Sequence, residues 1–255
     1  MNLLITAGNT LAPLDQVRAI TNIFTGRTGA SIAQTAAARG HSVTLLTSHP
    51  EVVYNIEGGS IPPEHLLAVI EFRTFDDLTG LMQQEIRKGL YDVVIHCAAV
   101  SDYLVSGVFS PEAGTYFNAK TKGWETIDHQ TPMLFEQKGG KIKSNEPELW
   151  VRMVRAPKLV DRIRNPWGFA GLLVKFKLEV GLNDSQLIDI AEQSRLQSDA
   201  DLIVANTLEG AKHYALVGPR DGRYDRVPRR ELAEYLILYL EDLNRLYRAT
   251  GVAHG

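Results

Sequence analysis

The feature that constrains this chain most is a strand–helix–strand pattern within its first 47 residues. An apolar run at 3–7 turns at Gly8, and a second apolar run occupies 42–47. Between them, residues 30–39 are rich in good helix formers, and Gly40 stands where glycine often ends a helix. Because a helical crossover makes the strands that it joins parallel, the pattern predicts a βαβ unit with two neighbouring parallel strands.

The loop before this helix is long for such a connection and ends in the sequence Thr25-Gly26-Arg27-Thr28-Gly29. The first amides of a helix lack intrahelical partners, and its dipole favours negative charge there. Gly26 and Gly29 would let a phosphate approach the backbone, and Arg27 would add a charge-assisted contact. The alternative is that Gly26 only makes a turn and Gly29 only eases helix packing. No GxGxxG directly follows the first strand, and no GxxxxGK[ST] is present, so neither the ordinary dinucleotide fingerprint nor a Walker A loop is indicated.

The rest of the chain alternates between apolar runs and helical patterns. The sequence predicts strands at 69–75, 91–96, 148–154, 167–174, 201–205 and 213–217, and helices at 76–88, 157–163, 184–197 and 229–248. This alternation predicts an α/β protein with a Rossmann-like three-layer fold and a mostly parallel central sheet. We expect one domain over 1–255, interrupted at about 104–140 by an irregular insertion or flap that is rich in glycine and proline.

A second candidate site follows the run at 91–96, where the chain reads Cys97-Ala98-Ala99-Val100-Ser101-Asp102-Tyr103. Ligands of open α/β sheets bind beyond the carboxyl ends of the strands. The small side chains of Ala98 and Ala99 would leave room for a flat ring or a sugar, and Asp102 could reach a metal ion or a hydroxyl. The alternative is that the alanines pack tightly and Asp102 caps a turn.

Composition excludes several classes of function. A net charge of −3 does not suggest a nucleic-acid partner, and a single cysteine, Cys97, excludes an intramolecular disulfide and a cysteine metal cluster. No apolar stretch is long enough to span a membrane, and no signal-like segment precedes the first strand. We therefore expect a soluble, cytoplasmic protein with no membrane partner.

Three segments together resemble the phosphopantothenate–cysteine ligase (phosphopantothenoylcysteine synthetase) family, and the resemblance covers nearly the whole chain. They are Pro13-Leu14-Asp15-Gln16-Val17-Arg18-Ala19-Ile20-Thr21-Asn22 with the turn at 25–29, Ala98-Ala99-Val100-Ser101-Asp102-Tyr103, and Lys141-Ile142-Lys143. Residues 168–170, 201–206 and 229–233 are similar to the family too. Two departures stand out. Ser144 replaces a common lysine, and the stretch between Tyr103 and Lys141 is longer than in compact bacterial members.

The resemblance implies a ligase that activates the carboxylate of 4′-phosphopantothenate with CTP or ATP. An acyl-nucleotidylate forms, pyrophosphate leaves, and the amine of cysteine then attacks the acyl carbon. The resemblance also implies Mg²⁺ and a homodimer. Many bacterial relatives carry a flavin-dependent decarboxylase domain before the ligase, whereas this chain begins at the ligase, so we expect neither flavin nor decarboxylation.

The resemblance also assigns site residues. Asn22 would contact the acyl intermediate, and Lys141 would offset charge in the activation step. On its own, Lys141 would be interpreted as a solvated surface lysine. The nucleotide would be bound by Gly8, Thr25, Gly26, Arg27, Gly29, Ala98, Ala99, Asp102 and Phe169, with Phe169 lining the base and Asp102 also a candidate Mg²⁺ ligand.

Two other classes of protein remain open. Tyr116 and Lys120 match the YxxxK pattern of short-chain dehydrogenases that use NAD(P), and Ala98-Ala99 follows a strand as in that class. The glycine-rich dinucleotide turn of those enzymes is missing. The third class is a nucleotide-binding relative that has lost turnover, against which the joint presence of Asn22, Asp102 and Lys141 argues.

Overall fold

The computed structural model describes residues 1–55 and 67–250, and the chain divides into two compact units. The first unit comprises Met1–Thr10, Ile23–Val100 and the chain from Lys158 onward. The second comprises Leu11–Asn22 and Ser101–Pro157. The 104–140 region therefore lies wholly in the second unit, together with the chain on either side of it and the segment before the phosphate turn.

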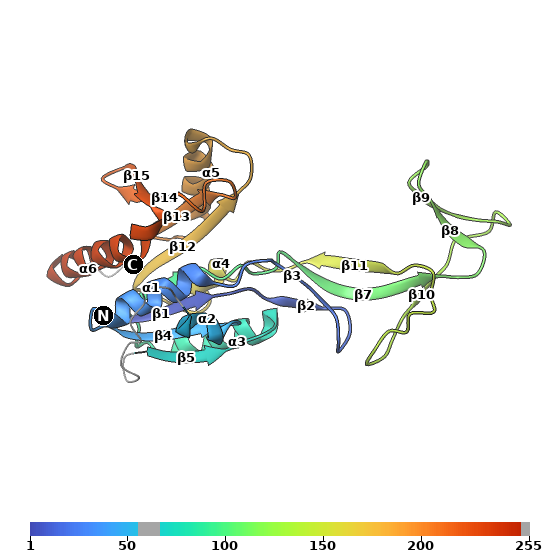
Figure 1. Ribbon diagram of the computed structural model, residues 1–255, viewed down its shortest axis with the longest axis horizontal. Helices are drawn as coiled ribbons and strands as arrows, with labels where there is room; N and C mark the ends of the chain where they lie inside the picture. The colour runs from blue at the N-terminus through green and yellow to red at the C-terminus, as the bar shows by residue number, and fades with distance from the viewer. Residues whose placement is uncertain (56–66, 251–255) are drawn as a thin grey trace. The chain divides into compact units, whose positions relative to one another are not determined.

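The first unit is built on an eight-stranded sheet in the order β15-β14-β13-β12-β6-β1-β4-β5 (Figure 1). Neighbours from β13 to β5 are parallel, and β14 and β15 extend the sheet antiparallel at one edge. This mostly parallel sheet confirms the predicted fold class. The strands are β1 (Asn2–Ala7), β4 (Ser42–Thr47), β5 (Leu67–Glu71), β6 (Val93–His96), β12 (Leu172–Glu179), β13 (Leu202–Thr207), β14 (Tyr214–Arg220) and β15 (Arg223–Pro228).

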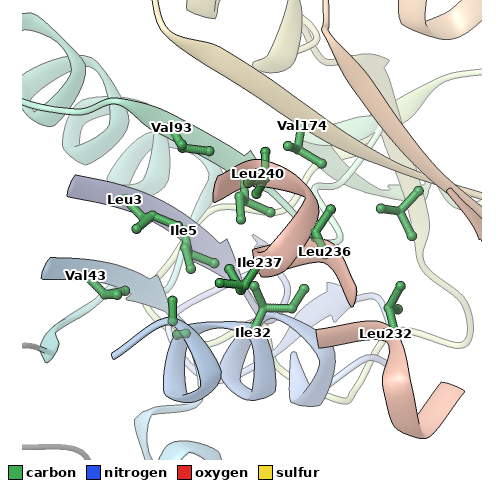
Figure 2. Packing of buried hydrophobic residues seen from close by; sticks show 14 of the residues in the cluster. Leu3, Ile5, Ile32, Val43, Val93, Val174, Leu232, Leu236, Ile237 and Leu240 are labelled. Carbon is green, nitrogen blue, oxygen red and sulfur yellow. The ribbon is translucent and has the colours of Figure 1, made fainter. Parts of the chain in front are cut away.

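Helices cover both faces of this sheet and make the unit three-layered. Because strand side chains alternate between faces, Leu3 and Ile5 pack with α1 and α6 (Figure 2). On the opposite face, Ile203 and Ala205 pack with α5. The helices are α1 (Arg27–Ala38), α2 (Pro50–Tyr54), α3 (Phe75–Arg87), α4 (Val160–Arg164), α5 (Asp184–Gln197), a 3₁₀ turn (Arg229–Glu231) and α6 (Leu232–Thr250). Among the residues described, none of these helices combines the length and apolar character that a membrane span needs.

The first βαβ unit forms as the sequence predicts. β1 and β4 are parallel neighbours, with Leu3 opposite Val43 and Ile5 opposite Leu45. α1 crosses between them and ends before Gly40, whose φ of +85° is a conformation that glycine adopts without strain.

The second unit is built from short antiparallel strands rather than the irregular chain predicted for 104–140. β7 (Tyr103–Pro111) lies between β10 (Leu134–Glu136) and β11 (Trp150–Arg155), while β8 (Thr115–Asn118) and β9 (Gly123–Thr126) form a hairpin. Aromatic rings of this unit replace a large core: Phe117, Trp124 and Trp150 lie 4.5–5.5 Å apart between centroids. The chain before the phosphate turn is also a hairpin, of β2 (Leu11–Pro13) and β3 (Ala19–Thr21).

Two further differences concern the first unit. The strand predicted at 167–174 is instead β12, which begins at Leu172 and extends to Glu179. β15 was not predicted, because its polar sequence lacks a continuous apolar run and only Val227 of its residues is buried.

The contact of α1 with β1 gives a test of this packing. A Cβ at Gly29 would lie 2.7 Å from Ala7 Cβ and 3.1 Å from Thr6 O. Gly29→Ala should therefore lower the free energy of unfolding by about 1–3 kcal/mol, measured by urea denaturation.

Gly80→Ala is the matched control, because this exposed glycine of α3 has no atom within 4 Å of its Cβ position. It should raise stability by about 1 kcal/mol through helix propensity. Equal effects of the two substitutions would contradict the packing role of Gly29.

Candidate functional site

The glycines predicted to bind the nucleotide, Gly8, Gly26 and Gly29, lie where β1 meets α1. Gly8 follows β1 with a φ of +85°, and Gly26 is the N-cap residue of α1 with a φ of +80°. A Cβ on Gly26 would lie 2.2 Å from the amide nitrogen of Gly8, so the two backbones are in direct contact. The spaces beside Gly8 and Gly29 are likewise filled by Ser48 and Ala7. These glycines are therefore required by packing, whatever they bind.

The N-terminus of α1 has no side-chain cap. Gly26 offers no side chain for one, whereas α3 and α5 each begin with a full capping box, at Thr74 and Asn183. Arg27 is the first helical residue and is exposed, as is Thr25 before it. The first amides of α1 with an adjacent guanidinium can bind an anion such as a phosphate.

The chain after β6 reaches the same edge of the sheet. The Ala99 amide donates to the carbonyl of Gly8 at 2.8 Å, and the Ala98 amide donates to the Thr6 hydroxyl at 3.1 Å. The chain passes from β1 to β4 on one side and later returns to β6 on the other, so this edge is a topological switch point. The structure thus brings Gly8, Gly26, Ala98 and Ala99 together at the usual ligand position of such a sheet.

A series of buried hydrogen bonds from His96 through Thr6 to the Ala98 amide holds this edge of the sheet in place. Thr6 Oγ1 lies 3.0 Å from His96 Nδ1 while it accepts from the Ala98 amide. Since the hydroxyl already accepts one hydrogen bond, it can donate to a neutral His96. Burial, together with the charge of Lys175, lowers the pKa of His96 to about 4, so the ring is neutral near pH 7. His96 therefore fixes the hydroxyl that orients the Ala98 amide.

Cys97, between these residues, is not an activated nucleophile. Burial raises the pKa of its thiol to about 12, which outweighs the opposite effects of Arg229 and the Gly29 amide. The thiolate that nucleophilic chemistry needs is therefore scarce at neutral pH.

The position of Phe169 does not fit its predicted role of lining the nucleotide base. It precedes β12, which pairs with β6 from Leu172 opposite Val93, so it lies at the amino ends of these strands. The glycines and alanines of the site follow the carboxyl ends, and Phe169 does not join them. Its ring is buried and lies 5.5 Å from the Arg164 guanidinium carbon, which is a packing role.

Phe176 is the aromatic residue of β12 on the side of the site. It stands one residue beyond Lys175, the last residue of β12 that pairs with β6. The sequence does not single out Phe176, because it is one aromatic residue inside an apolar run and because the predicted strand, 167–174, ends before it.

Asn22, Asp102 and Lys141 all belong to the second unit. Asn22 follows β3 and is half-buried, while Asp102 precedes β7 with its carbonyl accepting from the Ala156 amide at 2.8 Å. Lys141 lies on an exposed loop between β10 and β11.

A carboxylate that the sequence analysis did not select ties Lys141's loop to the β2–β3 hairpin. Asp15 accepts from the amides of Val17, Arg18 and Ile142 at 2.8–3.1 Å and from the Arg18 guanidinium. The same guanidinium donates to the Ile142 carbonyl at 2.9 Å. The pKa of Asp15 lies well below its usual range. The hydrogen bond from the Arg18 side chain is the largest cause, and the hydrogen bonds from backbone amides add to it. The sequence does contain a signal for this turn. Asp15 stands two and three residues before Val17 and Arg18, and an aspartate side chain commonly accepts hydrogen bonds from amides at those positions.

The YxxxK pair is not placed for dehydrogenase chemistry. Tyr116 lies in β8 and Lys120 in the turn after it, so the two side chains are not the adjacent neighbours that residues four apart are on a helix. The Tyr116 hydroxyl donates to Glu125 at 3.0 Å, and this hydrogen bond raises the pKa of the tyrosine. A catalytic tyrosine would need the opposite shift.

Among the residues that the structure describes, no group of three or more His, Cys, Asp or Glu side chains could hold a metal ion. Asp102 offers one exposed carboxylate. A single carboxylate fits a magnesium ion that takes its other ligands from substrate phosphates and water.

Comparisons with known families and curated proteins agree with this arrangement. Residues 1–111 match the family described as DNA/pantothenate metabolism flavoprotein C-terminal domain. The chain is 33% identical over 241 residues to the coenzyme A biosynthesis bifunctional protein CoaBC of Thermococcus kodakarensis, which covers 91% of this chain and 49% of that protein. With CoaBC of Escherichia coli K12, identity is 27% over 81% of this chain and 41% of that one. The chain thus spans about half the length of these relatives.

Solved structures show the same fold. The DNA/pantothenate metabolism flavoprotein of Streptococcus pneumoniae has a TM-score of 0.73 and 28% identity, over 95% of this chain and 99% of that one. A Cab2 mutant in complex with phosphopantothenate-cysteine has a TM-score of 0.65 and 19% identity, over 98% of this chain and 88% of that one. At 19% identity, the similarity to the Cab2 mutant is a similarity of fold alone.

The buried His96 predicts a pH dependence of stability. Its pKa is about 4 in the folded state and about 6.5 in the unfolded state, so the unfolded chain takes up the proton first as pH falls. The stability that neutral His96 contributes is complete above about pH 6.5 and is lost toward pH 4, by about 3 kcal/mol in total. Urea midpoints measured between pH 7.5 and 4.5 should follow this decline.

His96→Gln should remove this part of the slope, whereas His213→Gln, at an exposed position, should retain it. A His96→Gln slope equal to that of the unmodified chain would rule out His96 as the titrating group.

Proposed function

Because the chain belongs to the phosphopantothenate–cysteine ligase family, we propose that it joins 4′-phosphopantothenate to cysteine at the expense of a nucleoside triphosphate. The observation that carries the proposal is the uncapped N-terminus of α1, with Arg27 beside it, at the switch point where Gly8, Ala98 and Ala99 meet. A triphosphate is the ligand that such an edge suits best.

The chemistry follows from the weakness of a carboxylate as an electrophile. A carboxylate oxygen attacks the α-phosphorus, pyrophosphate leaves, and the resulting mixed anhydride carries a good leaving group. The cysteine amine then attacks the acyl carbon, releases the nucleoside monophosphate and loses a proton. Holding the reactants together supplies much of the rate, because the reaction becomes effectively unimolecular.

We assign the residues as follows. The α1 amides and Arg27 hold phosphate oxygens, and Ala98 and Ala99 leave room for the nucleoside. Lys141 offsets the negative charge on the phosphoryl oxygens in the activation step, and the Asn22 amide donates to the acyl intermediate without becoming charged. Mg²⁺ would neutralise phosphate charge, and Asp102 would hold it.

We also infer a homodimer. The second unit exposes large apolar side chains, among them Ile127, Met133 and Phe135, and exposed apolar groups of this kind commonly mark an interaction surface. Light scattering on the purified chain would test it, and a monomer at micromolar concentration would contradict it.

The direct test is pyrophosphate release with 4′-phosphopantothenate and Mg²⁺. CTP and ATP are compared, each with and without cysteine. We expect release that needs the acid and one of the nucleotides, with multiple turnovers only when cysteine is present, because only the amine clears the acyl-nucleotidylate. Nucleotide binding without release would indicate the non-catalytic class.

Lys141→Gln should lower pyrophosphate release by about 10²–10³-fold, the usual cost of removing one group that stabilises transition-state charge. Lys143→Gln is the matched control, since Lys143 is exposed on the same loop two residues away. Equal rates for the two variants would remove Lys141 from the catalytic residues.

A further inference from the structure

The first unit contains a pocket of about 490 Å³ between the beginning of α1, α2 and the beginning of α6. Its polar wall includes Arg27, Thr28 and Ser31 from α1 and Arg229 from the 3₁₀ turn. Apolar side chains such as Leu232, part of the α1–α6 packing in Figure 2, line the rest. The pocket thus joins two guanidinium groups and two hydroxyls in one space of ligand size.

Arg229 is fixed in this wall. Its guanidinium donates to Thr28 Oγ1, and its own amide donates to the His213 carbonyl at 2.8 Å. The side chain is partly buried, and this burial lowers the pKa of the guanidinium. Because Thr28 accepts from Arg229, its hydroxyl proton remains free to be donated toward a ligand.

Among the described residues, the two arginines of the pocket have no ion-pair partner. Within residues 1–55 and 67–249, no carboxylate forms an ion pair with Arg27 or Arg229. Glu51 is the acidic residue that lines the pocket, and its carboxylate lies 3.0 Å from His49 Nδ1. Other half-buried arginines do have such partners, as Arg164 has Asp201 at 2.8 Å. A desolvated cation without a counter-charge is costly, and this cost favours binding of an anion.

We propose that this pocket binds a phosphate group, with Arg229 as its principal ligand and with Arg27, Thr28 and Ser31 completing the site. A planar guanidinium can donate two parallel hydrogen bonds to phosphate oxygens, and hydroxyl donors fill the remaining acceptor positions. The phosphate has two sources to consider, the tail of the nucleotide or a separate phosphate-bearing molecule. Arg27 is shared with the proposed nucleotide site, whereas Arg229 has no role in the function proposed above.

The test is direct binding of inorganic pyrophosphate to the full chain, measured by calorimetry without turnover. Arg229→Gln should weaken binding by about 10–100-fold, the usual loss for a hydrogen-bonded charge. Arg230→Gln is the matched control. Its side chain is exposed and paired with Glu231 at 3.1 Å, so binding should be unchanged.

Ser31→Ala provides a second variant that keeps both charges, and it should weaken pyrophosphate binding several-fold even if Arg229→Gln fails to fold. Pyrophosphate binding that is unaffected by Arg229→Gln and Ser31→Ala, or absent from the unmodified chain, would overturn the proposal.

A titration of pyrophosphate in saturating CTP or ATP separates the two sources. Competition, with nucleotide affinity also lowered by Arg229→Gln, assigns the pocket to the nucleotide phosphates. Simultaneous binding assigns it to a separate phosphate-bearing ligand. Because neither arm requires catalysis, an enzyme that fails to release pyrophosphate can still bind it here, and the two proposals fail independently.

Discussion

The direct backbone contact between β1 and α1 is the constraint on which the first unit depends. Gly26 touches Gly8, and Gly29 touches Ala7, with no space for a side chain at either position. This contact sets how far the first helical amides stand from the end of β1. Since the Ala99 amide bonds to Gly8, the same contact also places the chain that follows β6. The glycines that packing requires are therefore the same ones that we propose to bind the nucleotide.

Buried polar groups extend this constraint into the sheet. His96 stands opposite Lys175 in the parallel pairing of β6 with β12, and Lys175 donates to Ser198 Oγ and to the Ser194 carbonyl at 2.8 Å. Burial lowers the pKa of Lys175 to about 8. Such groups are stable inside a protein only when each hydrogen bond is made, so they specify one arrangement of the strands around them.

Sequence could predict the parts of the fold whose signals are local. The bounds of α5 follow from the polar pair Asn183-Asp184, of which Asn183 is the N-cap, and from helical composition, and the parallel β1–β4 pair follows from its crossover helix. The strands at 104–140 carry no such signal, because they are short and are stabilised by ring contacts that become visible only in three dimensions. The family was recognised from its motifs and is confirmed, and the glycine and alanine positions do meet at one edge. The roles of Asn22 and Lys141 stay predictions, and Phe169 shows that a short motif can be matched at the wrong end of a strand.

The Asp15 cluster links two segments that are distant in sequence. One carboxylate accepts from both the hairpin and Ile142, and Arg18 donates across the same gap. The loop that carries Lys141 therefore cannot be exchanged by itself. Its conformation depends on hydrogen bonds to the β2–β3 hairpin, which lies more than a hundred residues earlier in the sequence. In a chimera that takes only this loop from a relative, the loop would lack the hairpin residues that hydrogen-bond to it, and its lysine would not be held in the same position. Only a transplant of both segments would preserve the local geometry.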